Sequence, residues 1–382
     1  MMPNPTDSIE TSFLCAGCQT SKDVAEKLAS FLSQATESIA IAAYSFNLCP
    51  EERDVILAAL KARAQAGVSI RIIYDQANPQ ALPPWHFDPC DLSTPQFVQS
   101  LGFPSRMIEG NRALMHHKYV VLDGNTPRAA VWTGSTNFTD DSWKLQENNV
   151  IILRSQELAR YYVKDFEELW VDGRIESEGL MDSGEATLVY GGKPAYAFVN
   201  FSPGEGDWID ESIANAINRA RESITIAAVV VTSTRLLRAL LDAIERGVRI
   251  EGIYDLTQME GVKYQWQLVP ANTWKIGAFA RIVRYGNLVG KRSTPYNPSS
   301  KHDYMHNKVM VLDDTVLTGS YNFSRHAQQN AENSLIIQSA PLAATYRDYI
   351  HRLIRMYAPQ SENFSEGEAV PAATRPAPEA IG

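Results

Sequence analysis

The sequence has no apolar run that approaches the roughly 18 residues needed to cross a bilayer. Its first residues, MMPNPTDSIETS, carry neither the charged nor the apolar segment of a secretory signal. Basic side chains are also scarce: 35 Lys and Arg stand against 44 Asp and Glu, a net charge of -9. The sequence therefore predicts a cytoplasmic protein without integral membrane association. A broad basic surface for nucleic acid is excluded, so any phosphate-binding site must be locally positive.

Cysteine is scarce as well, with only Cys15, Cys18, Cys49 and Cys90. The spacing of Cys15 and Cys18, with two residues between them, is found in zinc and redox sites. No second Cys or His pair stands at zinc-ribbon spacing. We therefore interpret the four side chains as ordinary reduced thiols, with no metal site and no cofactor expected.

What the chain does contain is a repeated motif. MHHKYVVLDG at 115–124 and MHNKVMVLDD at 305–314 share a His-x-Lys followed by four residues and an Asp. These residues are His116, Lys118 and Asp123 in the first copy and His306, Lys308 and Asp313 in the second. The apolar residues before each Asp predict a buried strand, on which the His and the Lys share one face. Each Asp falls on the other face or just past the strand end, where it supports the site rather than reacts.

The residues that follow repeat too. TGSTNFT at 133–139 precedes Glu147, and TGSYNFS at 318–324 precedes Glu332. The histidines are 190 positions apart and the two glutamates 185, a difference that falls in a hairpin at 124–130. One His on an apolar strand is usually a satisfied core residue, but a repeated constellation with its indel in a turn indicates a duplicated fold.

With both copies in view, the chain resembles the phospholipase D superfamily, whose hallmark is a pair of H-x-K-x4-D motifs, each followed by G-[ST]-x-N. The resemblance covers about residues 20–358. The GS-x-N-F-[ST] form followed by Glu-Asn is similar to the branch of bacterial endonucleases and mitochondrial cardiolipin hydrolase-like nucleases. An Asp and an Arg-Ser shortly after the Asn, more usual in lipid-synthesising members, are missing.

Two histidines on opposite sides of one phosphorus can divide the work of phosphodiester cleavage. One attacks to give a phosphohistidine, and the other protonates the leaving oxygen and then activates water. The resemblance implies this assignment without a metal, and His116 is the expected nucleophile because many relatives use the N-terminal histidine. The predicted catalytic residues are His116, Lys118, Asn137, Glu147, His306, Lys308, Asn322 and Glu332.

The expected roles differ between these residues. The lysines and asparagines would surround the phosphoryl oxygens as fixed donors, and the glutamates would fix the histidine tautomers. Supporting positions are Asp123, Ser135, Asp313 and Ser320, the two serines as further hydroxyl donors. Phosphate contacts in a mostly acidic protein would come from a more basic loop at 286–303. Its candidate substrate-binding residues are Lys291, Arg292, Lys301 and His302, with solvated surface as the equal alternative.

Helical and strand patterns alternate in the same order in both halves, which predicts parallel or mixed sheets covered on both faces. We expect an α/β fold of two tandem pseudo-symmetric phospholipase D-like sandwich domains, at 1–178 and 185–358. The segment 359–382, rich in Pro and poor in large apolar residues, is expected to be disordered. A second irregular stretch, 76–95, precedes the first motif and is the other candidate rim of the site.

Taken together, the sequence predicts a metal-independent phosphodiesterase, a nuclease or endonuclease acting on DNA or RNA. The alternatives are a phospholipase D or phosphatidyltransferase acting on phospholipids, and a silent binding subunit, although neither copy has lost a catalytic position. Nucleic acid is the expected partner, together with a protein partner for targeting. The sequence leaves open a monomer or a homo-oligomer, because one chain carries both motifs.

Overall fold

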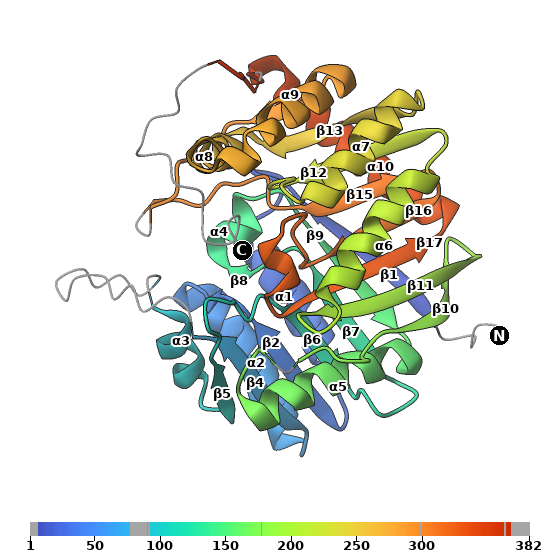
Figure 1. Ribbon diagram of the computed structural model, residues 1–382. Coiled ribbons are helices and arrows are strands. Elements are labelled where there is room, and N and C mark those ends of the chain that lie inside the picture. The colour runs from blue at the N-terminus through green and yellow to red at the C-terminus, as the bar shows by residue number, and fades with distance from the viewer. Residues whose placement is uncertain are drawn as a thin grey trace.

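The computed structural model describes residues 7–76, 90, 92–176, 178–297, 300–362 and 364–367. Strands and helices alternate through the first half of the chain (Figure 1). Its strands are β1 (Ser8–Leu14), β2 (Ser38–Ala43), β3 (Phe46–Asn47), β4 (Ser69–Asp75), β5 (Ser105–Ile108), β6 (Lys118–Leu122), β7 (Ala130–Gly134), β8 (Phe138–Thr139) and β9 (Asn148–Arg154). Its helices are α1 (Ser21–Leu32), α2 (Pro50–Gln65), α3 (Thr94–Leu101), α4 (Asp140–Lys144) and α5 (Gln156–Asp172).

The second half repeats the plan after a hairpin of two strands. Its strands are β10 (Gly184–Tyr190), β11 (Lys193–Ser202), β12 (Ser223–Ala228), β13 (Arg249–Asp255), β14 (Val289–Lys291), β15 (Lys308–Leu312), β16 (Thr315–Gly319) and β17 (Glu332–Gln338). Its helices are α6 (Gly206–Arg219), α7 (Thr234–Glu245), α8 (Leu256–Leu268), α9 (Trp274–Gly286) and α10 (Ala340–Tyr357), with short 3-10 turns η1 (Pro270–Asn272), η2 (His326–Gln328) and η3 (Ala358–Gln360).

The two halves share one sheet of 15 strands, in the order β14-β13-β12-β15-β16-β17-β11-β10-β1-β9-β7-β6-β2-β4-β5. The order reads as the same seven positions from either end, with β10 between them. In each half the outer strands pair in parallel, as β2 with β4 and β12 with β13, while the motif strands β6 and β15 pair antiparallel with their neighbours. The expected α/β fold with two tandem repeats is confirmed, although the halves are joined through their sheet. The boundaries 1–178 and 185–358 remain a prediction.

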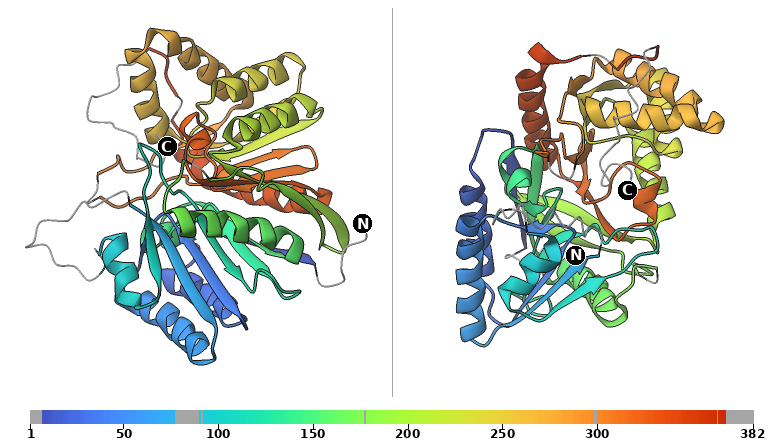
Figure 2. Two further views of the ribbon diagram at one scale, coloured as in Figure 1. Left: turned by 60° about the horizontal axis from the view of Figure 1, so that its bottom comes forward. Right: turned by 90° about the vertical axis from the view of Figure 1, so that its left-hand side faces the viewer.

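Three apolar cores hold the layers together. One lies under the outer helices α1 to α4 of the first half, and a second lies under α6 to α9 of the second half. The third spans both halves, because α5 and α10 pack into it together with β1, β9, β11 and β17. Phe13 of β1 stacks on Tyr349 of α10, with ring centroids 4.3 Å apart, across that junction. Figure 2 shows the halves meeting along this central layer.

Several elements differ from the sequence-based expectation. The segment after α5, where the sequence places the boundary between the domains 1–178 and 185–358, leads into β10 and β11 at the centre of the sheet. Part of the expected disordered tail 359–382 also belongs to the fold. Phe364 is buried against Phe279, with ring centroids 5.0 Å apart, and Ser361 and Glu362 bind Gly290 and Arg292. Residues 368–382 lie outside the described part of the chain.

The cysteine interpretation is wrong in this structure. Cys15 is disulfide-bonded to Cys18 and Cys49 to Cys90. The first pair closes because the left-handed Gly17, at φ +74°, turns the chain back after β1. The second joins positions 41 residues apart, which no local spacing could indicate.

None of the described helices is long and apolar enough to span a membrane.

Candidate active site

The residues that lead into the two motif strands, β6 and β15, lie at the junction of the halves, where each is hydrogen-bonded to the opposite half. The backbone N–H of His116 donates to the carbonyl of Ala331 at 2.9 Å, and that of His306 donates to the carbonyl of Glu147 at 3.0 Å. Both imidazoles are fully buried. Each half therefore delivers its histidine into a frame built by the other half.

A carboxylate in each half holds the residue just before its histidine. Asp75, at the end of β4, accepts the N–H of Met115, and Asp255, at the end of β13, accepts that of Met305. Burial raises the pKa of Asp255 to about 6, against the hydrogen bonds it accepts. These positioning residues were not singled out from the sequence. Their signal was the Tyr-Asp ending shared by β4 and β13.

His116 is held by Glu332, as expected. Its Nδ1 lies 2.8 Å from both carboxylate oxygens of Glu332. Its Nε2 is buried and has no hydrogen-bond partner among the described residues. Burial, followed by the charges of Lys118 and Lys308, lowers the pKa of His116 well below its usual range. A neutral imidazole that donates Nδ1–H to Glu332 leaves the Nε2 lone pair available for attack.

His306 has a different partner. Its Nδ1 lies 2.9 Å from Oδ1 of Asn148, not from Glu147. The Nδ2 group of Asn148 donates to the carbonyl of Ser142 and to Oε1 of Gln146, both at 3.1 Å. These two acceptors fix the amide so that its oxygen faces the ring, and His306 must therefore carry its proton on Nδ1. Both imidazoles carry a proton on Nδ1, but the partner of His116 is a carboxylate and the partner of His306 is a neutral amide.

The register of the sheet explains why Asn148, and not the predicted Glu147, is the partner of a histidine. Gly134 pairs with Val150, and Gly319 pairs with Ser334. The glycines are 185 positions apart but their partners only 184, so Asn148, and not Glu147, occupies the position of Glu332. Asn149 and Asn333 correspond in the same way at the interface between the halves. Oδ1 of Asn149 accepts from Tyr346, and Nδ2 of Asn333 donates to Tyr162. The sequence alone does not show this one-residue shift, because it depends on which residues pair across neighbouring strands.

Glu147 belongs to a separate buried group between the halves. Its carboxylate pairs with Lys291 of β14 and accepts from the hydroxyl of Tyr357 and the N–H of Ala16. Lys291 was expected on a substrate-binding rim, but it is only 5% exposed and neutralised by this ion pair. A buried charge must be paired, and Lys291 and Glu147 satisfy each other.

The expected donors lie on the same strands and turns as the histidines. Lys118 and Lys308 are buried, and the Nζ of each donates to the carbonyl of the histidine in its own motif, at 2.8 and 2.9 Å. Asn137 and Asn322 are buried as well, each three residues after a left-handed glycine. A Cβ on Gly134 would lie 2.3 Å from the carbonyl oxygen of Asn149, so only glycine permits this approach.

The two motif serines hydrogen-bond the residues that hold the histidines. The hydroxyl of Ser135 donates to Oδ1 of Asn148 at 2.7 Å, and Ser320 hydrogen-bonds Glu332 and lowers its pKa. Each serine also accepts a backbone N–H from the neighbouring strand, from Asn149 or Asn333, at 3.0 Å. They support the histidine partners, in place of the expected direct donation to phosphate.

The motif aspartates are structural. Asp123 accepts the backbone N–H groups of Thr36, Glu37 and Ser38, which lead into β2. Asp313 accepts those of three consecutive residues that lead into β12. Burial tends to raise the pKa of each carboxyl, but these donors outweigh it and the pKa is lowered. Both aspartates tie the motif hairpin to the central strand beside it.

The other predicted rim residues have local partners. Arg292 pairs with Glu260 and Glu362, and Lys301 pairs with Asp303. The His302 ring stacks against Tyr304, with centroids 5.5 Å apart. The expected basic rim is therefore largely neutralised within the described residues. Of the other irregular stretch, 76–95, residues 77–89 and 91 lie outside the described residues.

One buried cluster has the spacing of a metal site. His117, Asp165 and Glu178 offer ligand atoms within 4.8 Å of one another. His117 points away from His116, across the strand, and its Nε2 lies 2.7 Å from Glu178. Burial and the neighbouring Asp165 raise the pKa of Glu178 well above its usual range. A protonated Glu178 can hydrogen-bond His117, which accounts for the cluster as a buried network.

Fold and site together define a duplicated α/β protein in which two histidine-lysine motifs meet at a pseudo-twofold junction. The family described as cardiolipin synthase, PLD-like domain, matches residues 28–170 and 213–354, most of both repeats. The chain belongs to the phospholipase D superfamily.

Individual relatives match in part. Phospholipase D of Rickettsia bellii (strain RML369-C) is 31% identical over 148 residues, 38% of this chain and 63% of that protein. Mitochondrial cardiolipin hydrolase of Xenopus tropicalis is 31% identical over 148 residues, 38% of this chain and 61% of that protein. Each match thus covers less than two thirds of the relative's length. The crystal structure of phosphatidylserine synthase from Haemophilus influenzae Rd KW20 shares the fold at a TM-score of 0.63 and 14% identity, over 91% of this chain and 86% of that one.

Proposed function

We propose that this protein is a phosphodiesterase that cleaves through a phosphohistidine intermediate without a metal ion. The observation that carries the proposal is the reciprocal holding of the two imidazoles. Nδ1 of His116 is bound by Glu332, and Nδ1 of His306 is bound by Asn148, each from the opposite half. Two Nε2 atoms at one junction, with two buried lysines beside them, match the needs of an in-line displacement at phosphorus.

The different partners of His116 and His306 favour different roles for the two histidines. Nε2 of His116 attacks phosphorus and forms the N–P bond, and the cation that results is stabilised by the carboxylate of Glu332. His306 acts as the acid in its imidazolium form, protonated at Nε2 as well as at Nδ1, and the bond to the leaving oxygen breaks as Nε2 gives that oxygen its proton. The Asn148 amide accepts a hydrogen bond but offers no charge to retain an imidazolium, which favours proton donation. His306 then takes a proton from water, whose oxygen displaces His116 from phosphorus.

Nucleic acid is the proposed substrate, on the strength of the GS-x-N-F-[ST] form of both motifs. A cytoplasmic location, association with nucleic acid and a protein partner for targeting are part of the same proposal. Disulfides are rare in the cytosol, so the two cysteine pairs weigh against that location.

A phospholipid substrate is the second candidate. Two relatives are named phospholipase D and cardiolipin hydrolase. Leu268, Val269 and Trp274, between α8 and the start of α9, are 64%, 45% and 37% exposed. Exposed apolar side chains at one turn suit contact with a lipid surface.

The test is cleavage of plasmid DNA, single-stranded DNA, RNA, and phosphatidylcholine and cardiolipin vesicles, with and without EDTA. We expect cleavage of a nucleic acid that survives EDTA. Cleavage of lipid alone would select the second candidate. Loss of all cleavage on chelation, with rescue by Mg2+, would contradict the metal-free mechanism.

A further inference from the structure

Beside the second motif lies a hollow of about 360 Å³ that is unusual for so acidic a protein. Three of its lining residues are Lys275, Arg325 and His326. Three more are the carboxamides Gln265, Asn272 and Gln329. Of the described residues that line it, none is an aspartate or a glutamate. Hydrogen-bond donors with positive charge, and no carboxylate, are what an anion requires.

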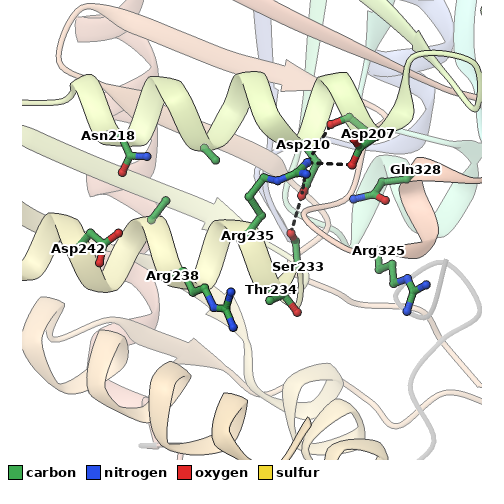
Figure 3. Close-up of a pocket in the computed structure, with 12 residues that line it drawn as sticks. Asp207, Asp210, Asn218, Ser233, Thr234, Arg235, Arg238, Asp242, Arg325 and Gln328 are labelled. Atoms are coloured by element: carbon green, nitrogen blue, oxygen red, sulfur yellow. Dashed lines mark hydrogen bonds and ion pairs between the residues drawn. The ribbon is translucent and has the colours of Figure 1, made fainter. Parts of the chain in front are cut away.

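The cationic side chains are close enough to repel one another. The charge of Arg325, added to burial, lowers the pKa of both Lys275 and His326. Lys275 is only 7% exposed and donates to the carbonyl of Thr232 at 3.0 Å. Arg325 also lines the adjoining hollow, where Arg235 is joined to Asp207 and Asp210 (Figure 3), but within the described residues Arg325 itself lies within 4 Å of no carboxylate. The charge of Asp210 offsets the repulsion on Lys275 in part, and an anion in the hollow would offset it further.

Two residues that line the hollow stand close in the chain to catalytic residues. Arg325 is three residues after Asn322, so their Cα atoms are at most about 11 Å apart. Gln329 precedes Asn330, whose side chain contacts Glu332 and accepts the N–H of Leu114, two residues before His116. An anion held here would therefore be a neighbour of the phosphate at the histidines.

Within the described residues, the first half differs at the positions that correspond to Arg325 and His326. The positions that follow TGSTNFT are Asp140 and Asp141, where TGSYNFS is followed by Arg325 and His326. Asp140 accepts the N–H of Cys49, and Asp141 accepts that of His302. One side of the pseudo-symmetric junction thus carries cations and the other carries carboxylates. A substrate with several phosphates would be drawn to one side only.

We propose that the hollow formed by Lys275, Arg325 and His326 binds a second, uncleaved phosphate group of the substrate and so sets the direction in which the substrate lies. This rests on the proposed phosphodiesterase activity. The chemistry is common to the next phosphate of a nucleic acid and to the second phosphate of cardiolipin. The two sources are separated by the substrates of the test.

The test compares substrates with one and two phosphates. Bis(p-nitrophenyl) phosphate, an unphosphorylated dinucleotide and phosphatidylglycerol carry one. A dinucleotide with a terminal phosphate and cardiolipin carry two. In the double variant Arg325→Gln, His326→Gln, we expect kcat/KM to fall about tenfold for the preferred two-phosphate substrate and to stay within about twofold for its one-phosphate match. Arg325→Lys should recover most of the loss.

The matched control is Arg238→Gln, which removes the same charge from the adjoining hollow and should leave both substrate classes unchanged. Equal losses for one-phosphate and two-phosphate substrates, no loss for either, or the same loss in Arg238→Gln would overturn the proposal. The same ligands are titrated into His116→Ala, where the phosphorylated dinucleotide or cardiolipin should bind about tenfold more tightly than its match. That ratio decides the second-phosphate site even if no substrate is cleaved, an outcome that would defeat the proposed function alone.

Discussion

At position 148 an asparagine occupies the place that a glutamate occupies at position 332. The sequence identified the residues that define the motifs because each copy repeats them at fixed spacing. It missed Asn148, Asp75 and Asp255, whose roles depend on which strand lies beside which. The sequence offered Glu147 as a residue that fixes a histidine tautomer, but the sheet register moves the first copy by one residue, and a one-residue shift on a strand changes which face a side chain occupies.

Because Glu332 is charged and Asn148 is neutral, substitutions at the two positions should affect different steps of the reaction. Glu332→Gln removes the charge that stabilises the cationic phosphohistidine, so kcat should fall roughly 10²- to 10⁴-fold for every substrate. Asn148→Asp supplies a charge that retains the imidazolium, so cleavage should slow for alkyl leaving groups but not for p-nitrophenolate, which needs no acid. The ratio of the two substrates' rates in each variant is the measurement. The same ratio in both variants would contradict the assignment of roles.

The pH dependence of kcat/KM should follow the titration of Glu332. Burial raises its pKa to about 8, although Lys118 and Ser320 act against the rise. Below that pH the Glu332–His116 pair holds one proton more than attack allows, and above it Nε2 of His116 is free. We expect kcat/KM for an activated substrate to rise from pH 6 to about 8 and then to level off. A profile that falls across this range would rule out the pair as the nucleophilic unit.

At the scale of elements, the motif strands and most flanking helices could be predicted because their periodicity is local. Helix α1 begins at Ser21, α2 at Pro50 and α7 at Thr234, within the alternation of helices and strands that the sequence predicts. Strands β10 and β11 could not, because they depend on the long-range pairing with β1 and β17.

The motif aspartates are predicted to stabilise these elements and not to react. Asp123→Ala leaves three backbone N–H groups without their acceptor and should lower the free energy of unfolding by about 1–3 kcal/mol. Asp313→Ala is its matched partner in the other half and should cost a similar amount. Since the pKa of each carboxyl is lowered, its contribution is present above the unfolded pKa and is lost as pH falls through the folded pKa. Urea unfolding at pH 7 and pH 3 measures both effects, and an unchanged midpoint at pH 7 would refute this role.

The cysteine pairs make a prediction about the loop before α3. Cys49 is the N-cap residue of α2, and its bond to Cys90 joins positions 41 residues apart. Cys49→Ser should therefore lower the free energy of unfolding by about 2–4 kcal/mol under non-reducing conditions. In the presence of a strong reductant the variant and the parent should be equally stable. Free thiols in the unreduced, denatured protein would show instead that the bonds do not form.

At the scale of the whole molecule, duplication could be predicted from the sequence, but the way the halves interlock could not. The repeat order indicated two α/β domains with their motifs facing each other. The continuous sheet and the core shared by α5 and α10 depend on contacts between residues more than 150 positions apart, such as Asn333 with Tyr162. The result is one junction in which each half supplies a histidine and the partner of the other half's histidine.

The most direct test of this account is to map the covalent intermediate in His306→Ala. The variant is mixed with an activated phosphodiester in EDTA, quenched in acid and digested for mass spectrometry. We predict an adduct on His116 that accumulates, because no residue is left to activate water, and none in His116→Ala. An adduct on His306 in His116→Ala would reverse the assignment of roles. The absence of any adduct under single-turnover conditions, while the parent protein cleaves the substrate, would contradict the covalent mechanism.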